Sequence, residues 1–447
     1  MHDPIGNRCL PTEESLNRNL QPRENKTEEI DVIIAKQLEE RFVRYATVGT
    51  QSAEGMGQTP STKTQLELQR MLLSELGGMG AADVRLTEHG FVIATIPPSL
   101  DGVPTLAFLA HVDTALDYAA SDVRPIVHRD YDGKPIVLPG DKSQVLDEGT
   151  APELKDKIGD TIVTSDGTTL LGADDKAGVA VIMTLAERLL SDSSIPHGAI
   201  RVCFTPDEEI GTGIAKLSRE ELDADVAYTL DGEALGEVTY ESFSADRAVV
   251  RIEGVAIHPG KAKGRLVNAL TLAAKLVGML PQHTRTPETT AGREGFIHLT
   301  RMMGSSAEAE LHFILRDFER EGLAAHGEAL CAAVKALGRL EPRAKVSCEI
   351  TKQYRNMRYW LEDDMRPAEL AIEAVRRAGI EPDIVPIRGG TDGSQLTERG
   401  LPTPNLFAGI HNAHGPLEWT SVGEMEKALE TCLQLVQLWA DERAPSS

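Results

Sequence analysis

Two adjacent glutamates, Glu208 and Glu209, stand shortly after the apolar run AIRVCFT (199–205), behind Pro206 and Asp207. Two ionised carboxylates side by side in a dry pocket would repel each other, and a divalent cation between them would remove that repulsion. One glutamate could then bind the metal while the other accepts a proton from a metal-activated water. The pair would fit an ordinary surface turn equally well, so other parts of the sequence are needed to distinguish a metal site from a surface turn.

Four further apolar runs lead into residues of the same chemical kind. They are TLAFLA before His111 and Asp113, TTLLGA before Asp174, VAYTL before Asp231, and TPNLFAG before His411 and His414. Ligands of parallel sheets gather beyond the carboxyl ends of the strands, so we expect all these side chains at one sheet edge. Histidines combined with several carboxylates are the composition of a metal site.

Each of these motifs has an ordinary explanation when it is taken alone. A single His-x-Asp after a strand is more often a polar loop, and the acids of DDK (174–176) suit the N-terminal end of a helix. Five independent coincidences at one edge are less probable than one site. The pattern therefore favours a metal centre.

The elements that must position these residues follow an α/β pattern. Short apolar runs alternate with amphipathic helices, such as 178–190, which predicts a mixed, largely parallel sheet covered by helices. From about residue 243 the order becomes β-α-β-β-α-β, which is a ferredoxin-like α+β unit. We predict a catalytic domain over 33–242 and 355–447, an inserted lid or dimerisation domain over 243–354, and a disordered N-terminal extension over 1–32.

Composition excludes several classes of partner. The chain of 447 residues has a net charge of −23 and no block of Lys or Arg, which argues against nucleic acid and anionic membranes. No apolar run approaches the ~18 residues of a membrane span, and the N-terminus lacks the apolar centre of a signal peptide. Its five cysteines are scattered without CxxC spacing, which indicates a reducing compartment. We predict a cytoplasmic protein.

From about residue 33 to the end, the motifs together resemble the peptidase T family, tripeptide aminopeptidases among the co-catalytic di-zinc metallopeptidases. The motifs are HVDTALD, TTLLGADDKAG, TPDEEIG, YTLDGE, HPGKAKGRLVNAL, LRDFER, PIRGGTDGSQL and PNLFAGIHNAHG. The resemblance implies an enzyme that removes the N-terminal residue from small peptides, with two zinc ions per subunit. It also implies a homodimer formed through the inserted domain.

The resemblance assigns a role to each matching residue. The implied ligands are His111 and Asp231 for one zinc, Glu209 and His414 for the other, and Asp174 as the bridge between them, followed by a cis peptide bond to Asp175. Glu208 would be the general base, and Asp113 would orient His111. The implied substrate contacts are His258, which would bind the substrate or the developing oxyanion across the dimer, and Asn268, Arg316 and Arg388.

One departure and two alternatives accompany this assignment. Pro416-Leu417 stands where the family is expected to carry a basic pair, which bears on fine substrate preference. A related di-zinc dipeptidase or N-acyl-amino-acid hydrolase would share the ligands and the base. A non-catalytic peptide-binding dimer is the third interpretation, and Glu208 argues against it because a pure binder needs no base.

Overall fold

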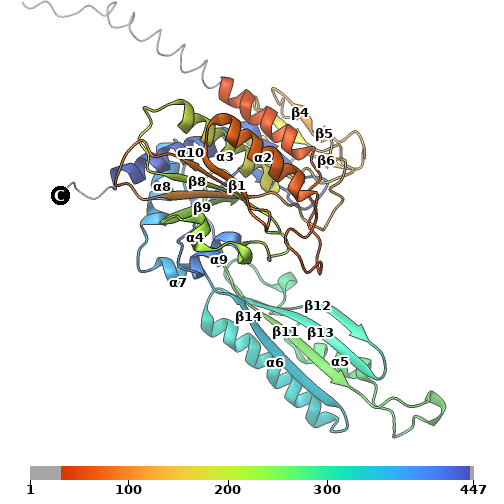
Figure 1. The fold of residues 1–447 in the computed structure, drawn as a ribbon. Helices are drawn as coiled ribbons and strands as arrows, with labels where there is room; N and C mark the ends of the chain where they lie inside the picture. Colours follow the sequence, from red (N-terminus) through yellow and green to blue (C-terminus); the bar gives the residue numbers. More distant parts are fainter. Residues whose placement is uncertain (1–31, 443–447) are drawn as a thin grey trace, which may run out of the picture.

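The computed structural model describes residues 32–442, which form two lobes joined where the chain crosses between them twice (Figure 1). One lobe combines the residues before about 242 with those after about 355, and the elongated second lobe is formed by the segment between. The predicted N-terminal extension lies outside the described residues except for its last position, which belongs to a helix over 32–46. None of the described helices is both long and apolar enough to cross a membrane.

The larger lobe is built on an eight-stranded mixed sheet. Its strands, in spatial order, are β1 (Ala82–Leu86), β2 (Val92–Ile96), β8 (Ile200–Thr205), β3 (Leu106–His111), β9 (Val226–Gly232), β16 (Asn405–Phe407), β10 (Glu237–Thr239) and β15 (Asp383–Ile384). The central strands β8, β3, β9 and β16 are parallel, whereas β1, β2 and β10 pair with neighbours in antiparallel fashion. The predicted mixed α/β sheet is confirmed, with its parallel part at the centre.

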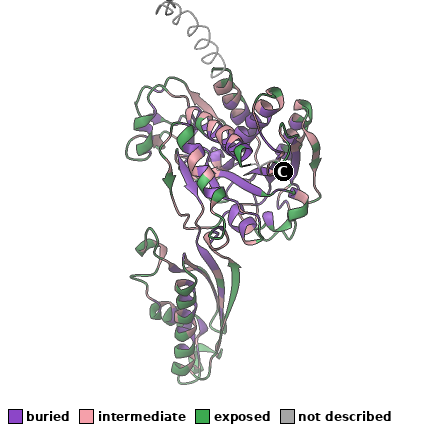
Figure 2. Cartoon of the chain, turned by 90° about the vertical axis from the view of Figure 1, so that its left-hand side faces the viewer, coloured by how far each residue is buried: buried purple, intermediate pink, exposed green. Residues whose placement is uncertain are grey.

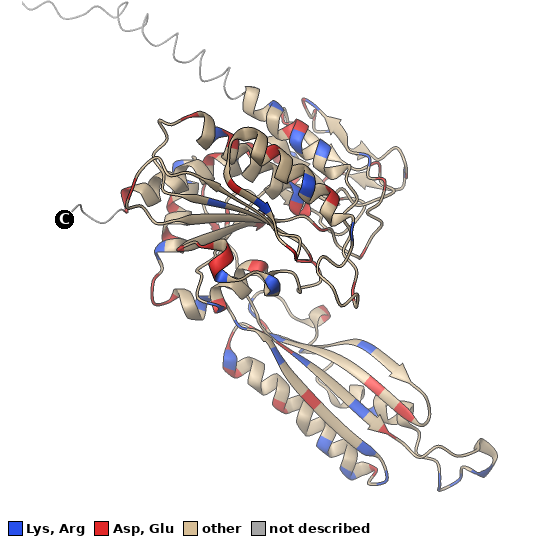
Figure 3. Cartoon of the chain, viewed as in Figure 1, with Lys and Arg blue, Asp and Glu red and all other residues tan. Residues whose placement is uncertain are grey.

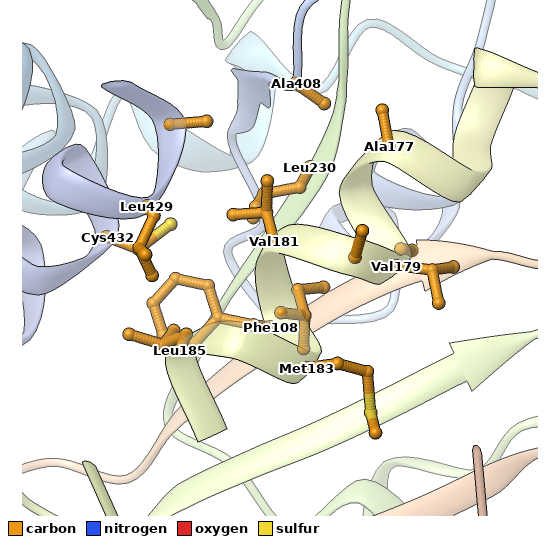
Figure 4. Packing of buried hydrophobic residues seen from close by; sticks show 14 of the residues in the cluster. Phe108, Ala177, Val179, Val181, Met183, Leu185, Leu230, Ala408, Leu429 and Cys432 are labelled. Atoms are coloured by element: carbon orange, nitrogen blue, oxygen red, sulfur yellow. The ribbon is translucent and has the colours of Figure 1, made fainter. Parts of the chain in front are cut away.

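Helices cover both faces of this sheet, which explains why its central strands are continuous apolar runs. The helices are α2 (Gln65–Met79), α3 (Ala173–Ser191), α8 (Arg366–Arg377) and α10 (Val422–Asp441) on one face, and α4 (Arg219–Leu222) and α9 (Asp392–Glu398) on the other. Phe108 of β3 packs among Val181, Leu185 and Leu429 on the first face (Figure 4). Its neighbour Leu109 faces the opposite side, as the two-residue period of a strand requires.

Smaller elements complete this lobe. They are the sheet β17 (Ile410–His411), β18 (Trp419–Ser421), β7 (Ile162–Thr164) and β4 (Ile126–His128), the pair β5 (Ile136–Val137) and β6 (Val145–Leu146), helix α7 (Arg358–Leu361), and the 3-10 turns η1 (Pro152–Asp156) and η2 (Ile214–Lys216). The run TTLLGA, which we treated as a strand end, forms no strand. That expectation is wrong, because residues 168–172 form a buried loop that enters α3 directly.

The second lobe has the predicted ferredoxin-like order. Its elements are β11 (Ser244–Glu253), η3 (Pro259–Lys261), α5 (Ala269–Met279), η4 (Pro287–Thr289), β12 (Phe296–Gly304), β13 (Glu308–Asp317), α6 (Arg320–Leu340) and β14 (Lys345–Tyr354). The spatial order β12-β13-β11-β14 is antiparallel throughout. Helices α5 and α6 pack on one face, where Val250, Leu276, Leu311 and Leu330 form a separate core.

The opposite face of this small sheet is open, and the lobe is more exposed than the larger one (Figure 2). Charged residues are distributed along its strands (Figure 3). Among them, Arg251 Nε donates to Glu310 at 2.8 Å. Where the chain crosses between lobes, Glu241 accepts hydrogen bonds from Arg293 at 2.6 Å and from Arg358 at 2.7 Å. These ion pairs tie the two crossings and the base of the second lobe together.

Candidate metal centre

A cavity of about 890 Å³ lies at the carboxyl ends of the central strands and is lined by residues of both lobes. His111 is the last residue of β3, Asp231 lies near the end of β9, and Glu208 and Glu209 follow β8. Asp174 belongs to the first turn of α3, and His414 follows β17. All six of these residues line the cavity.

The side chains form two groups that share one aspartate. His111 Nε2 lies 2.8 Å from Asp174 Oδ1 and 3.5 Å from Asp231 Oδ1. His414 Nε2 lies 3.3 Å from Asp174 Oδ2 and 3.2 Å from Glu209 Oε2. Each oxygen of the Asp174 carboxylate therefore faces a different histidine, which is the arrangement needed for a bridging ligand between two cations.

The chemistry of these donors fits a bound cation. Glu209 Oε1 is buried and has no hydrogen-bond partner among the described residues, a condition that costs free energy unless a ligand occupies it. Burial raises the pKa of the Asp231 carboxyl to about 7. Hydrogen bonds to Asp174 and Glu209 raise the pKa of the His414 ring to about 11. A divalent cation would relieve this crowding of carboxylates.

Asp175 also comes close to His111 and Asp231, but its carboxylate has another task. Donor atoms of His111, Asp175 and Asp231 lie within 4.8 Å of one another, as do those of His111, Asp174 and Glu209. Asp175 is fully buried, and its two oxygens accept the backbone N–H groups of His111 at 3.0 Å and Gly178 at 3.2 Å. Asp174, whose oxygens face the cavity, is therefore the better ligand candidate. The peptide bond between the two aspartates is cis.

Comparison with known proteins identifies the family of this chain. Residues 166–438 match the model of Peptidase family M20/M25/M40. The chain belongs to this family. It is 45% identical to Peptidase T of Geobacillus kaustophilus (strain HTA426) over 405 residues, which cover 90% of this chain and 98% of that protein. It is likewise 45% identical to Peptidase T of Bacillus subtilis (strain 168) over 399 residues, which cover 89% of this chain and 97% of that protein.

Solved structures share the fold. The aminopeptidase PepT from Bacillus cereus ATCC 10987 superposes with a TM-score of 0.71 at 24% identity, covering 91% of this chain and 99% of that one. A dinuclear metal-binding peptidase of the M20 family from Bacillus subtilis superposes with a TM-score of 0.62 at 16% identity, covering 92% of this chain and 99% of that one. The two-lobed fold is therefore that of the M20 peptidases.

In this M20 peptidase, Asp113 connects the histidine to the pair of glutamates. Its buried carboxylate accepts the backbone N–H of Glu208 at 3.0 Å and that of Glu209 at 3.2 Å. Asp113 Oδ1 lies 3.4 Å from His111 Nδ1, and the backbone carbonyl of Asp113 is closer to the same nitrogen, at 3.0 Å. Asp113 therefore offers the ring nitrogen Nδ1 of His111 two acceptors, its side-chain carboxylate and its backbone carbonyl, and either could orient the ring as predicted.

Glu208 is half-buried in an acidic environment. Burial raises the pKa of its carboxyl well above the ordinary value, and Asp231 and Asp392 act in the same direction, while His111 opposes them. A carboxylate with a raised pKa is a stronger base. Its backbone is held by Asp113, so the side chain is presented to the cavity from a fixed turn.

Sequence analysis missed one residue that holds the metal centre together. Glu418 is 1% exposed, and its carboxylate accepts the backbone N–H groups of Leu171 at 2.7 Å, Gly172 at 2.8 Å and Asp174 at 3.0 Å. It therefore fixes the loop that delivers Asp174. The only signal in the sequence was an acid in the apolar setting of GPLEWT, close after His414.

His411, the other histidine of this segment, lies outside the centre. Its Nε2 is 2.5 Å from Glu424 Oε2, and its ring stacks on Trp419 with the centroids 3.9 Å apart. The same glutamate is paired with Lys157. This buried network positions the turn that carries His414.

The predicted substrate contacts fall into two sets. Arg316 and Arg388 line the cavity. Arg316 Nη1 donates to Gln353 Oε1 at 3.1 Å and to the carbonyl of Leu315 at 3.0 Å, and it pairs with no carboxylate of the described residues. Arg388 Nη1 donates to the carbonyls of Gly292 and Glu294, both at 2.8 Å, so it also connects the two lobes.

His258 and Asn268 do not line the cavity of their own chain. His258 is in the exposed loop before η3, and its Nδ1 accepts the N–H of Gly260 at 3.2 Å. Asn268 caps α5 by accepting the N–H groups of Leu270 and Thr271 at 3.0 and 3.3 Å. Their roles in substrate binding stay predictions that require a second subunit.

Proposed function

We propose that this M20 peptidase is a di-zinc aminopeptidase that hydrolyses the N-terminal residue from tripeptides. The observation that carries the proposal is the pair of His–carboxylate groups that share Asp174. The chain is 45% identical to proteins named Peptidase T over about nine-tenths of its length, which supports the same activity. A structure described as a tripeptidase from Staphylococcus aureus shares the fold, with a TM-score of 0.71.

The residues that would hold the metals follow from their grouping. His111 and Asp231 would bind one zinc ion, Glu209 and His414 the other, and the two oxygens of Asp174 would serve both. Zinc bound in such a site supplies Lewis-acid chemistry, which lowers the pKa of a water and polarises a carbonyl. Asp113 and Glu418 bind no metal in this scheme, and they hold the backbone of the ligands.

Glu208 would be the general base. In the proposed reaction its carboxylate accepts the proton of the attacking water and then delivers it to the amine that leaves. The desolvation and the neighbouring acids that raise the pKa of Glu208 favour its protonated state between these two transfers. Asp113 limits the movement of Glu208 by accepting its backbone N–H.

Substrate length would be read by the second lobe. Arg316 reaches the cavity from β13 and carries a guanidinium without a carboxylate partner among the described residues. Such a group is suited to the C-terminal carboxylate of a short peptide. Arg316 forms no ion pair with the neighbouring acids Asp317 and Glu319, which favours the substrate role.

The proposal also includes a homodimer and a cytoplasmic location. A homodimer formed through the second lobe would bring His258 of one subunit to the cavity of the other. Cys203 and Cys432 are free and buried in apolar cores, as expected of a cytoplasmic protein. Small peptides, rather than nucleic acids or membranes, remain the proposed partners.

A substrate panel combined with metal analysis tests the function. We expect two zinc ions per chain and a much higher kcat/KM for Ala-Gly-Gly than for Ala-Gly or N-acetyl-alanine. Preferential cleavage of the dipeptide or of the acyl amino acid would instead assign one of the related hydrolase activities. Peptide binding without turnover in the zinc-loaded protein would contradict an enzymatic role.

A further inference from the structure

One carboxylate of the cavity, that of Glu233, has no partner among the residues that the structure describes. Glu233 is exposed and lines the same cavity as His111 and His414. Its side chain makes no hydrogen bond and no ion pair with any residue between 32 and 442, and it belongs to none of the His–carboxylate groups described above. The chain thus presents an additional negative charge beside the metal centre with no structural use for it.

The backbone that carries Glu233 is held firmly. The buried carboxylate of Glu237 accepts the N–H of Glu233 and the N–H of Ala234, both at 3.2 Å. The N–H of Glu237 in turn donates to the carbonyl of Ala234 at 3.1 Å, and β10 begins at this residue. Glu237 therefore stabilises the turn after β9, and the backbone of Glu233 is held in a defined position.

The lining of the cavity places Glu233 beside the reaction centre. Asp231 faces His111, and β9 ends at Gly232, whose carbonyl accepts the N–H of Ala408 at 2.9 Å. Asp231 and Glu233, on either side of this glycine, both line the cavity. The two carboxylates are therefore available to one ligand in the same cavity.

The two arginines that line the cavity do not pair with Glu233. Among the lining residues, only Arg316 and Arg388 carry a permanent positive charge. Arg316 donates to Gln353, and Arg388 donates to the carbonyls of Gly292 and Glu294. The carboxylate of Glu233 is therefore left for a cationic group of the ligand.

We infer that Glu233 is a specificity-determining residue that binds the α-ammonium group of the substrate. The inference rests on the proposed aminopeptidase function, because only such a substrate presents a free ammonium beside the scissile bond. A single Cα atom separates that nitrogen from the carbonyl carbon under attack, so the ammonium lies next to the residues that flank Asp231. Glu233 thereby distinguishes a free N-terminus from a blocked or internal peptide bond.

The test compares two substrates that differ only in the ammonium group, Ala-Gly-Gly and propionyl-Gly-Gly. Both are assayed with the zinc-loaded wild type, with Glu233→Gln and with Glu153→Gln, a matched change of an exposed glutamate in η1 that does not line the cavity. Each compound is also used as a competitor of a reporter tripeptide, so that a poorly cleaved one still gives an inhibition constant. Metal content is measured for every variant.

In the wild type we expect a strong preference for Ala-Gly-Gly, and Glu233→Gln should reduce this preference by about 10- to 100-fold, the usual effect of losing a charged hydrogen bond. Glu153→Gln should keep the full preference. An equal loss for both compounds, or an unchanged preference, would overturn the inference. So would a loss confined to peptides that begin with Lys or Arg, since the partner would then be the side chain. A wild type that cleaves no tripeptide would instead refute the proposed function.

Discussion

The two walls of the cavity differ in how firmly their functional groups are held. On the wall of the larger lobe, the ligand candidates lie on strand ends, and buried carboxylates such as Asp113, Asp175 and Glu418 bind the backbone around them. On the wall of the second lobe, Arg316 donates to one side-chain amide and two backbone carbonyls. His258 of the same lobe is in an exposed loop outside the cavity of its own chain. A metal centre needs donors fixed within fractions of an ångström, and one rigid sheet provides this.

Substrate recognition has a different requirement. Groups that bind both ends of a peptide must let it enter and then approach it, which a separate lobe can do by moving. The two lobes have independent cores and are joined by two chain crossings and the Glu241 ion pairs. The comparison leads to four predictions, from the largest expected effect to the smallest.

Glu208→Gln should abolish most of the activity. The amide keeps the size of the side chain but accepts no proton, and losing a general base typically costs ~10²–10⁴-fold in rate. We expect kcat to fall by this amount while metal analysis still finds two zinc ions per chain. Near-normal turnover, with Glu153→Gln as the control, would remove Glu208 from the proposed mechanism.

His258→Ala tests whether the second lobe acts across subunits. If His258 stabilises the developing oxyanion in the partner's cavity, its loss should lower kcat by ~10²–10³-fold. Co-expression with Glu208→Gln then provides a sharper measurement. Mixed dimers contain one intact composite site, so an equal mixture should recover about a quarter of the wild-type activity. Activity no higher than the sum of the two variants would show that His258 does not act across a dimer.

Glu418→Gln should weaken metal binding without touching a metal ligand. The amide oxygen can still accept hydrogen bonds, but the charge that organises the Asp174 loop is lost. Changes of this kind typically cost ~10–100-fold in metal affinity. Zinc titration against a competing chelator measures the effect, and activity at saturating zinc should largely recover. An unchanged zinc affinity would mean that the Asp174 loop holds its position without Glu418.

Arg316→Ala should impair tripeptide cleavage by a smaller factor, because the residue is partly exposed. Loss of an ionic hydrogen bond at such a site corresponds to ~10–30-fold in kcat/KM. Zinc content should not change. Amidating the C-terminus of the tripeptide should reproduce the loss in the wild type and add little in the variant. If amidation harms both proteins equally, Arg316 does not bind the carboxylate.

Much of this protein could be derived from the sequence because the information is local. Apolar runs such as TLAFLA mark buried strands, and the polar residues at or shortly after the end of each run lie at the strand's carboxyl end, which accounts for His111, Glu208 and Asp231. The β-α-β-β-α-β order likewise follows from periodicity along the chain. The resemblance of the motifs then added the roles that residue types alone left open.

Only the tertiary structure decided how these residues are held. Glu418 binds a loop about 245 positions away, and Asp175 bonds to the backbone of another strand, so no local pattern distinguishes them from surface acids. TTLLGA has the composition of a strand, but it forms a loop in which the N–H groups of Leu171 and Gly172 donate to Glu418. Partners of a buried carboxylate are chosen by the packing of distant segments, because each buried polar group must find a donor wherever the fold supplies one.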